Sequence, residues 1–103
     1  MRVNEYIGKE KSPFKEWFDI LDVKSALTIN TVITRMMQGN MSNIKNIGDG
    51  IFERVIDVGP GYRIYFGMES RDTIILLLGG TKKRQQKDIS KAKKLWKEYK
   101  SAI

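Results

Sequence analysis

The chain of 103 residues contains neither cysteine nor histidine. Without cysteine no disulfide can form, and no thiol can act as a nucleophile or a metal ligand. Without histidine the chain lacks the side chain that most often serves as a general base near pH 7, and it also lacks the commonest metal ligand. Any catalysis must therefore rely on carboxylates, lysine, arginine, tyrosine or hydroxyl groups, and no metal or other cofactor is expected.

Long apolar stretches are missing as well. No run approaches the roughly 18 apolar residues that a membrane-spanning helix needs, so no membrane is expected among the partners. The N-terminal residues Met1–Glu5 lack the apolar segment of a signal peptide, which makes a cytoplasmic location the default expectation. Apolar residues still make up 41% of the chain, enough for the core of a single domain spanning residues 1–103.

Positive charge is concentrated near the C-terminus. The net charge is +7, yet residues 1–80 carry ten basic and ten acidic side chains. Residues 81–103 carry nine basic and two acidic side chains, so the whole excess lies in this segment. Such a segment favours a polyanionic partner, because binding releases counterions and the electrostatic field steers the ligand. A solvated, lysine-rich helix face explains the same composition equally well.

The first half of the chain predicts one strand and two helices. Arg2–Ile7 suits a short strand. Ser12 followed by Pro13 is typical of a helix N-terminus, and large apolar residues follow at helical spacing. Asp22 is expected to cap a second helix over Val23–Gln38. Two helices this close in sequence should form an antiparallel hairpin.

The second half predicts three antiparallel strands and a final helix. Ile51–Val58 and Tyr62–Gly67 flank a tight Gly-Pro-Gly turn and should form a hairpin. The apolar run within Thr73–Leu78 suits a central strand covered on both faces and ended by two glycines. A basic loop over Thr81–Lys87 and an amphipathic helix over Ile89–Tyr99 complete the chain.

Alternation along the strand Tyr62–Gly67 separates its side chains between two faces. Tyr62 and Ile64 should face one side of the sheet, and Arg63 and Tyr65 the other. The order of strand, two helices, three antiparallel strands and helix predicts an α+β domain. We expect one small twisted sheet with the helix pair on one face and the last helix packed elsewhere.

Three segments carry a resemblance to a known family. They are Ser12–Phe18, Gly48–Phe66 with its Gly-Pro-Gly-Tyr-Arg turn, and Gly79–Ile89 with its lysines and paired glutamines. In order and spacing they resemble the RelE-like toxins, and most closely the branch called addiction-module killer proteins, which is related to HigB toxins. The resemblance implies a RelE-like fold, an antitoxin partner that is often a helix-turn-helix protein, and cleavage of mRNA, commonly on the ribosome.

The resemblance also implies where the site lies. The family uses basic residues on the concave face of the sheet and in the loop before the last helix. The catalytic residues expected on this basis are Arg63, Lys82, Lys87, Arg54 and Tyr65. The side chains expected to bind RNA are Lys83, Arg84, Gln85, Gln86, Lys45 and Tyr62.

These residue types suit RNA cleavage without a metal, in which the 2′-hydroxyl attacks the adjacent phosphorus. Arg63 could stabilise the extra negative charge, because its planar fork grips phosphate oxygens and stays protonated. A lysine within Lys82–Lys87 could transfer protons if neighbouring positive charges lower its pKa. Tyr65 or Tyr62 could stack on a base or share a proton network.

Structural roles compete with these assignments. Arg63 could instead pair across strands with Glu53 or Asp57, which also weakens either carboxylate as a candidate base. Tyr62 suits a core position as well as a base-stacking one. The lysines of the last helix could be a solvated face, or could contact ribosomal RNA as a set.

One position departs from the family pattern. The family often has Glu-Leu-Arg-Ile-Asp before the turn, whereas this chain has Glu53-Arg54-Val55-Ile56-Asp57. A shift of one residue in a strand moves a side chain to the opposite face. Either a bulge returns Arg54 to the active face, or that cation is missing and activity is reduced or altered.

Three alternative functions stay open. A toxin of the same fold could inhibit DNA gyrase, as ParE does, through protein binding alone. The chain could also be an inactive homologue that binds RNA without cutting it. A basic amphipathic helix that targets membranes or calmodulin accounts for the last helix alone and is the weakest of the three.

Overall fold

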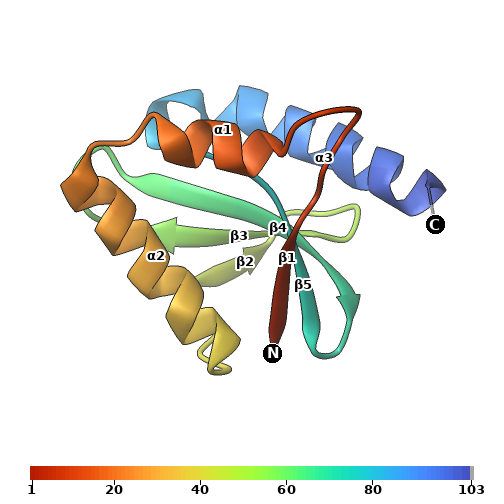
Figure 1. Cartoon of the computed structure of the whole chain (residues 1–103), viewed down its shortest axis with the longest axis horizontal. Helices are drawn as coiled ribbons and strands as arrows, with labels where there is room; N and C mark the ends of the chain where they lie inside the picture. Colours follow the sequence, from red (N-terminus) through yellow and green to blue (C-terminus); the bar gives the residue numbers. More distant parts are fainter. Residues whose placement is uncertain (103) are drawn as a thin grey trace.

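The computed structural model describes residues 1–102 as a five-stranded mixed sheet with helices on both faces (Figure 1). The strands are β1 (Arg2–Glu5), β2 (Ile44–Asn46), β3 (Ile51–Ile56), β4 (Tyr62–Ser70) and β5 (Thr73–Thr81). The helices are α1 (Pro13–Asp19), α2 (Val23–Met37) and α3 (Gln85–Ser101), the last preceded by a 3₁₀ turn, η1 (Lys82–Arg84). The predicted α+β class is confirmed.

The sheet has the strand order β1-β5-β4-β3-β2. The strands β3, β4 and β5 form the predicted antiparallel meander, and Ile56 pairs with Tyr62 beside the Gly-Pro-Gly turn. Two features differ from the prediction. The short edge strand β2 was not foreseen, and β1 pairs in parallel with β5, so the sheet is mixed. Both depend on pairing between segments whose local sequence carries no signal of their partner.

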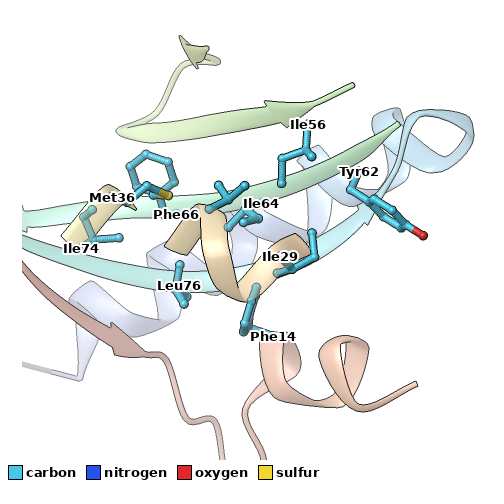
Figure 2. Packing of buried hydrophobic residues seen from close by; sticks show 10 residues of the cluster. Phe14, Ile29, Met36, Ile56, Tyr62, Ile64, Phe66, Ile74 and Leu76 are labelled. Atoms are coloured by element: carbon cyan, nitrogen blue, oxygen red, sulfur yellow. The ribbon is translucent and has the colours of Figure 1, made fainter. Parts of the chain in front are cut away.

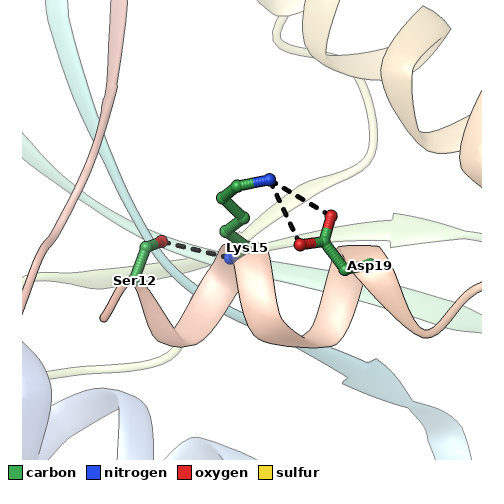
Figure 3. Close-up of polar contacts among 3 residues, drawn as sticks. All are labelled: Ser12, Lys15 and Asp19. Atoms are coloured by element: carbon green, nitrogen blue, oxygen red, sulfur yellow. Dashed lines mark hydrogen bonds and ion pairs between the residues drawn. The ribbon is translucent and has the colours of Figure 1, made fainter. Parts of the chain in front are cut away.

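Both predicted helix caps are confirmed. The Ser12 side chain accepts a hydrogen bond from the backbone N–H of Lys15 at 3.1 Å, and the Lys15 ammonium pairs with Asp19 one turn later (Figure 3). Asp22 caps α2 by accepting from the N–H of Ser25. The predicted antiparallel hairpin of helices is wrong, because α1 and α2 diverge at the turn between them and each packs on the sheet (Figure 1).

The predicted basic loop is largely helical. Lys82–Arg84 forms the 3₁₀ turn and α3 begins at Gln85, four residues before the expected start. The strand before it also runs past its expected end, since Gly79 and Gly80 belong to β5. These glycines are required by close packing on opposite faces: an added Cβ would overlap the Trp17 ring at Gly79, and the Asp88 carboxylate at Gly80.

Two hydrophobic clusters fill the two faces of the sheet. Under α1 and α2 the fully buried side chains include Phe14, Ile29, Ile64 and Phe66, which interdigitate as Figure 2 shows. The second cluster, under α3, consists of Ile51, Tyr65, Ile75, Leu77, Leu78, Ala92, Leu95 and Trp96. Alternation along β4 thus divides its side chains between the two faces as predicted. No helix among residues 1–102 has the length and apolar character to cross a membrane.

Candidate nucleic-acid interface

Arg63 lies on the face of the sheet that α3 covers, and only 6% of it is exposed. Its Nη1 donates hydrogen bonds to the carbonyls of Gly61 at 2.8 Å and Tyr62 at 3.5 Å, whereas its Nε has no partner among residues 1–102. The competing expectation of an ion pair with Glu53 or Asp57 is wrong, since no carboxylate within the described residues pairs with Arg63. The guanidinium is therefore not neutralised by a carboxylate of residues 1–102, although little of its surface is open to solvent.

Arg63 and Lys82 meet at the Gly-Pro-Gly turn. A Cβ added to Gly61 would lie 2.9 Å from Arg63 Nη1 and 3.3 Å from Lys82 Cβ, so both residues flank the same side of this glycine. The backbone N–H of Lys82 also donates to the Gly61 carbonyl at 2.8 Å. Gly61 has φ +74°, a conformation that glycine adopts without strain. The turn thus holds the two cation-bearing segments together.

A surface hollow follows directly from this junction. It is lined by Lys82, Lys83, Arg84, Gln85, Gln86 and Lys87, which are the predicted loop residues. No side chain caps the start of η1 or α3, so the first N–H groups of this helical segment have no side-chain partner. The Lys82 N–H is already bonded to Gly61, so the four cations of the hollow are what suits it to an anion such as phosphate.

Gln85 connects the hollow to a buried polar cluster, which we define as Glu53, Arg63, Tyr65 and Asp88. Glu53 and Tyr65 are cross-strand neighbours with no exposed surface. Gln85 Nε2 donates to Glu53 Oε2 at 2.8 Å and so ties the start of α3 to β3. Glu53 Oε1, the Tyr65 hydroxyl and Asp88 Oδ2 have no hydrogen-bond partner within residues 1–102.

Burial changes the acid–base behaviour of this cluster. It raises the pKa of Tyr65, and the nearby charges of Glu53 and Asp88 raise it further. It also raises the pKa of Asp88, against the opposing effect of Arg84 and Lys91. Tyr65 is therefore a neutral hydroxyl that is sealed from solvent, and the prediction that it contacts a base directly is wrong.

Arg54 lies on the opposite face of the sheet. The β3–β4 ladder is regular from Ile51 to Ile56, so no bulge returns Arg54 to the side of Arg63. Its Nη1 donates to the Val55 carbonyl at 2.6 Å, and burial together with the charge of Arg35 on α2 lowers its pKa. The predicted cooperation of Arg54 with Arg63 is wrong, because Val55 occupies the position opposite Arg63.

Two further predicted contacts fall outside this junction. Tyr62 is buried on the α1–α2 face, where its hydroxyl shares a 2.8 Å hydrogen bond with Ser25, so it is not a base-stacking group. Lys45 is exposed on β2 and pairs with Glu53 across the ladder, two strands away from Arg63.

Two residues of the buried polar cluster were not among the predicted site residues, namely Glu53, which was weighed only as an ion-pair partner or a weak candidate base, and Asp88. The Gly-Pro-Gly turn fixes the hairpin register, and that register alone places Glu53 opposite Tyr65. The sequence held a weaker indication of the place of Asp88. It lies in the first turn of α3, and its carboxylate packs against Gly80, where a larger residue would not fit.

Comparison with known proteins relates the chain to a bacterial protein. It is 43% identical over 86 residues to an uncharacterized protein of Haemophilus influenzae (strain ATCC 51907 / DSM 11121 / KW20 / Rd), and the match covers 82% of this chain and 87% of that protein. The chain belongs to the family of this Haemophilus protein. No family model and no solved structure matches it.

Proposed function

We propose that the chain is a RelE-like toxin of a type II toxin–antitoxin module, which binds mRNA and cleaves it without a metal ion. The observation that carries the proposal is the junction at Gly61, where Arg63 and Lys82 lie next to each other. Arg63 has no carboxylate partner among residues 1–102, and Lys82 also lines the hollow with its four cations. Its cellular partners under this proposal are a helix-turn-helix antitoxin and ribosome-bound mRNA in the cytoplasm. The β3–β4–β5 meander and the Gly-Pro-Gly hairpin support it through the family resemblance.

The proposed reaction is attack of an RNA 2′-hydroxyl on the adjacent phosphorus, with departure of the 5′-oxygen. The hollow over Lys82–Lys87 holds the backbone, and Arg63 stabilises the charge that develops on the phosphate oxygens. The hydrogen bond from Gln85 to Glu53 ties the start of α3, which lines the hollow, to strand β3. A lysine of the hollow is the proposed proton carrier, since the chain has no histidine to fill that role.

A non-catalytic RNA-binding homologue is the second candidate. This candidate is favoured because two of the predicted catalytic residues are not available to RNA. Arg54 lies on the far face of the sheet, and Tyr65 is fully buried. Without these two groups the surface offers cations for binding and fewer groups for proton transfer.

Arg63→Ala and Arg54→Met provide a matched test, because both arginines are buried, lie on adjacent strands and point to opposite faces. Cleavage of a labelled mRNA, with and without ribosomes and in the presence of EDTA, is the measurement. We expect Arg63→Ala to lower the rate by about 10²–10³-fold, the usual loss of a charge-stabilising donor. Arg54→Met should cut RNA at the wild-type rate. Circular dichroism confirms that each variant folds, and Arg63→Lys replaces Arg63→Ala if the latter does not.

Each other outcome identifies a different function. Binding of RNA without cleavage by the wild type supports the non-catalytic homologue. Growth arrest with DNA damage and intact mRNA supports the gyrase inhibitor. Full cleavage by the folded Arg63 variants contradicts the proposed role of Arg63.

A further inference from the structure

Beyond the Lys82–Lys87 hollow, α3 carries a second group of lysines. Lys93, Lys94, Lys97 and Lys100 line a separate hollow with Trp96 and with Asp49 from the turn between β2 and β3. We call these four side chains the distal lysines. They lie on the C-terminal half of α3, away from the Arg63 junction.

Most of the distal positive charge is not neutralised by the protein. Lys93 Nζ lies 3.4 Å from Asp49 Oδ2, which balances one charge. Lys100 Nζ lies 5.7 Å from the centre of the Trp96 ring, a contact that leaves its charge in place. Neither Lys94 nor Lys97 has an ion-pair partner among residues 1–102. Like charges three and four residues apart repel one another along a helix, so this arrangement opposes the stability of α3 unless an anion binds.

The two hollows are joined by a continuous cationic face. Lys87, Lys91, Lys94 and Lys97 are exposed and follow one another at intervals of three or four residues. Residues at that spacing lie on the same side of a helix. Glu98 is the only exposed acidic side chain of α3, so positive charge is in excess along the whole of this face.

We infer that the distal lysines form a second binding site for the phosphodiester backbone of the RNA whose cleavage site lies at Arg63. This inference rests on the proposed function and adds to it a requirement for RNA length. The hollows lie about 12 residues apart along α3, or roughly 18 Å at about 1.5 Å per residue. A stacked strand rises about 3.4 Å per nucleotide, so roughly five nucleotides separate the two sites. An RNA of about four nucleotides fills one site, and an RNA of about 20 nucleotides fills both.

The test compares two RNAs and two variants. The first variant replaces the four distal lysines by glutamine. The matched control replaces four exposed cations elsewhere, Lys9, Lys11, Lys24 and Arg71, by glutamine and so makes the same change in net charge. Affinities for fluorescein-labelled single-stranded RNAs of about four and about 20 nucleotides are measured over a range of salt concentration. For a single strand, the slope of log affinity against log salt concentration becomes less steep by about 0.7 for each phosphate contact removed.

We expect the distal variant to bind the long RNA at least tenfold more weakly than the control does, with a salt slope lower by about two to three, for three or four lost contacts. Its binding and cleavage of the short RNA should equal those of the control. Equal losses in the two variants for both RNAs would overturn the second site, because net charge alone would then explain them. The proposed cleavage function fails separately, if the wild type cuts no RNA with or without ribosomes or if Arg63→Ala leaves cleavage intact.

Discussion

Strand β4 buries different kinds of side chain toward the two faces of the sheet. Toward α1 and α2, β4 contributes Ile64 and Phe66 to an apolar cluster. Toward α3 it contributes Arg63 and Tyr65, which lie in the buried polar cluster with polar atoms that have no partner. Buried polar atoms without partners lower stability, so this polar cluster is shaped by another requirement, whereas the hydrophobic clusters on both faces stabilise the fold.

Arg54 is the exception that sharpens this comparison. It is a buried charge on the apolar face, and its Nε has no partner among residues 1–102. Its position on the far face separates it from Lys82 and from the hollow. Proximity in the sequence to the Gly-Pro-Gly turn is therefore not enough to place a cation at the candidate site.

The largest effect is expected from the apolar face. Phe66 is fully buried, and its ring stacks on that of Phe52 with 5.6 Å between the ring centroids. Phe66→Ala should lower the free energy of unfolding by about 3–5 kcal/mol, because it removes a large buried side chain and leaves a cavity. Urea denaturation measures the change. A loss below about 1 kcal/mol would mean that this face does not stabilise the fold as the comparison requires.

A smaller effect is expected from the polar face. Glu53→Ala removes the acceptor for Gln85, and a lost hydrogen bond of this kind lowers stability by about 1 kcal/mol. RNA cleavage should fall much more steeply, because the start of α3 is no longer tied to β3. Glu53→Gln keeps an acceptor oxygen, so it should restore both activity and hydrogen-exchange protection at Gln85–Asp88. Equal activity in the alanine and glutamine variants would contradict a positioning role for Glu53.

The smallest effect is expected from pH, because ionisation of Asp22 and ionisation of Asp88 should change stability in opposite directions. Hydrogen bonds from Ser25 lower the pKa of Asp22, so its stabilising effect is present above the unfolded pKa near 3.8 and is lost as the pH falls through the folded pKa. Burial raises the pKa of Asp88, so its ionisation lowers stability as the pH rises from about 3.8 through the folded value.

The two asparagine variants separate these contributions. Relative to the wild type, Asp88→Asn should gain stability as the pH rises from 4 to 7, whereas Asp22→Asn should lose it as the pH rises through the acidic range. Thermal unfolding in buffers spanning this range measures both. If stability relative to the wild type changed with pH in the same direction for both variants, burial under α3 would not disfavour the charged form of Asp88.

Local signals predicted much of the architecture. Ser12 and Asp22 begin helices because a side-chain oxygen can satisfy N–H groups only a few residues away. The Gly-Pro-Gly turn fixes the pairing of β3 with β4, and alternation then assigns Ile64 and Arg63 to opposite faces. The concentration of lysines in the last helix is likewise readable from composition.

Tertiary structure decided the features that depend on distant partners. The parallel pairing of β1 with β5, the addition of β2 and the divergence of α1 from α2 each bring together segments with no mutual signal in the sequence. The same holds for the site: Gln85 reaches Glu53 across 32 positions of the chain, and the burial of Tyr65 depends on α3 lying over it. Hydrogen-bonding caps and turns act over a few residues, whereas burial is set by whichever elements cover a side chain. The sequence by itself therefore determined which residue types were available, and only the packing of α3 on the sheet determined which of them share a site.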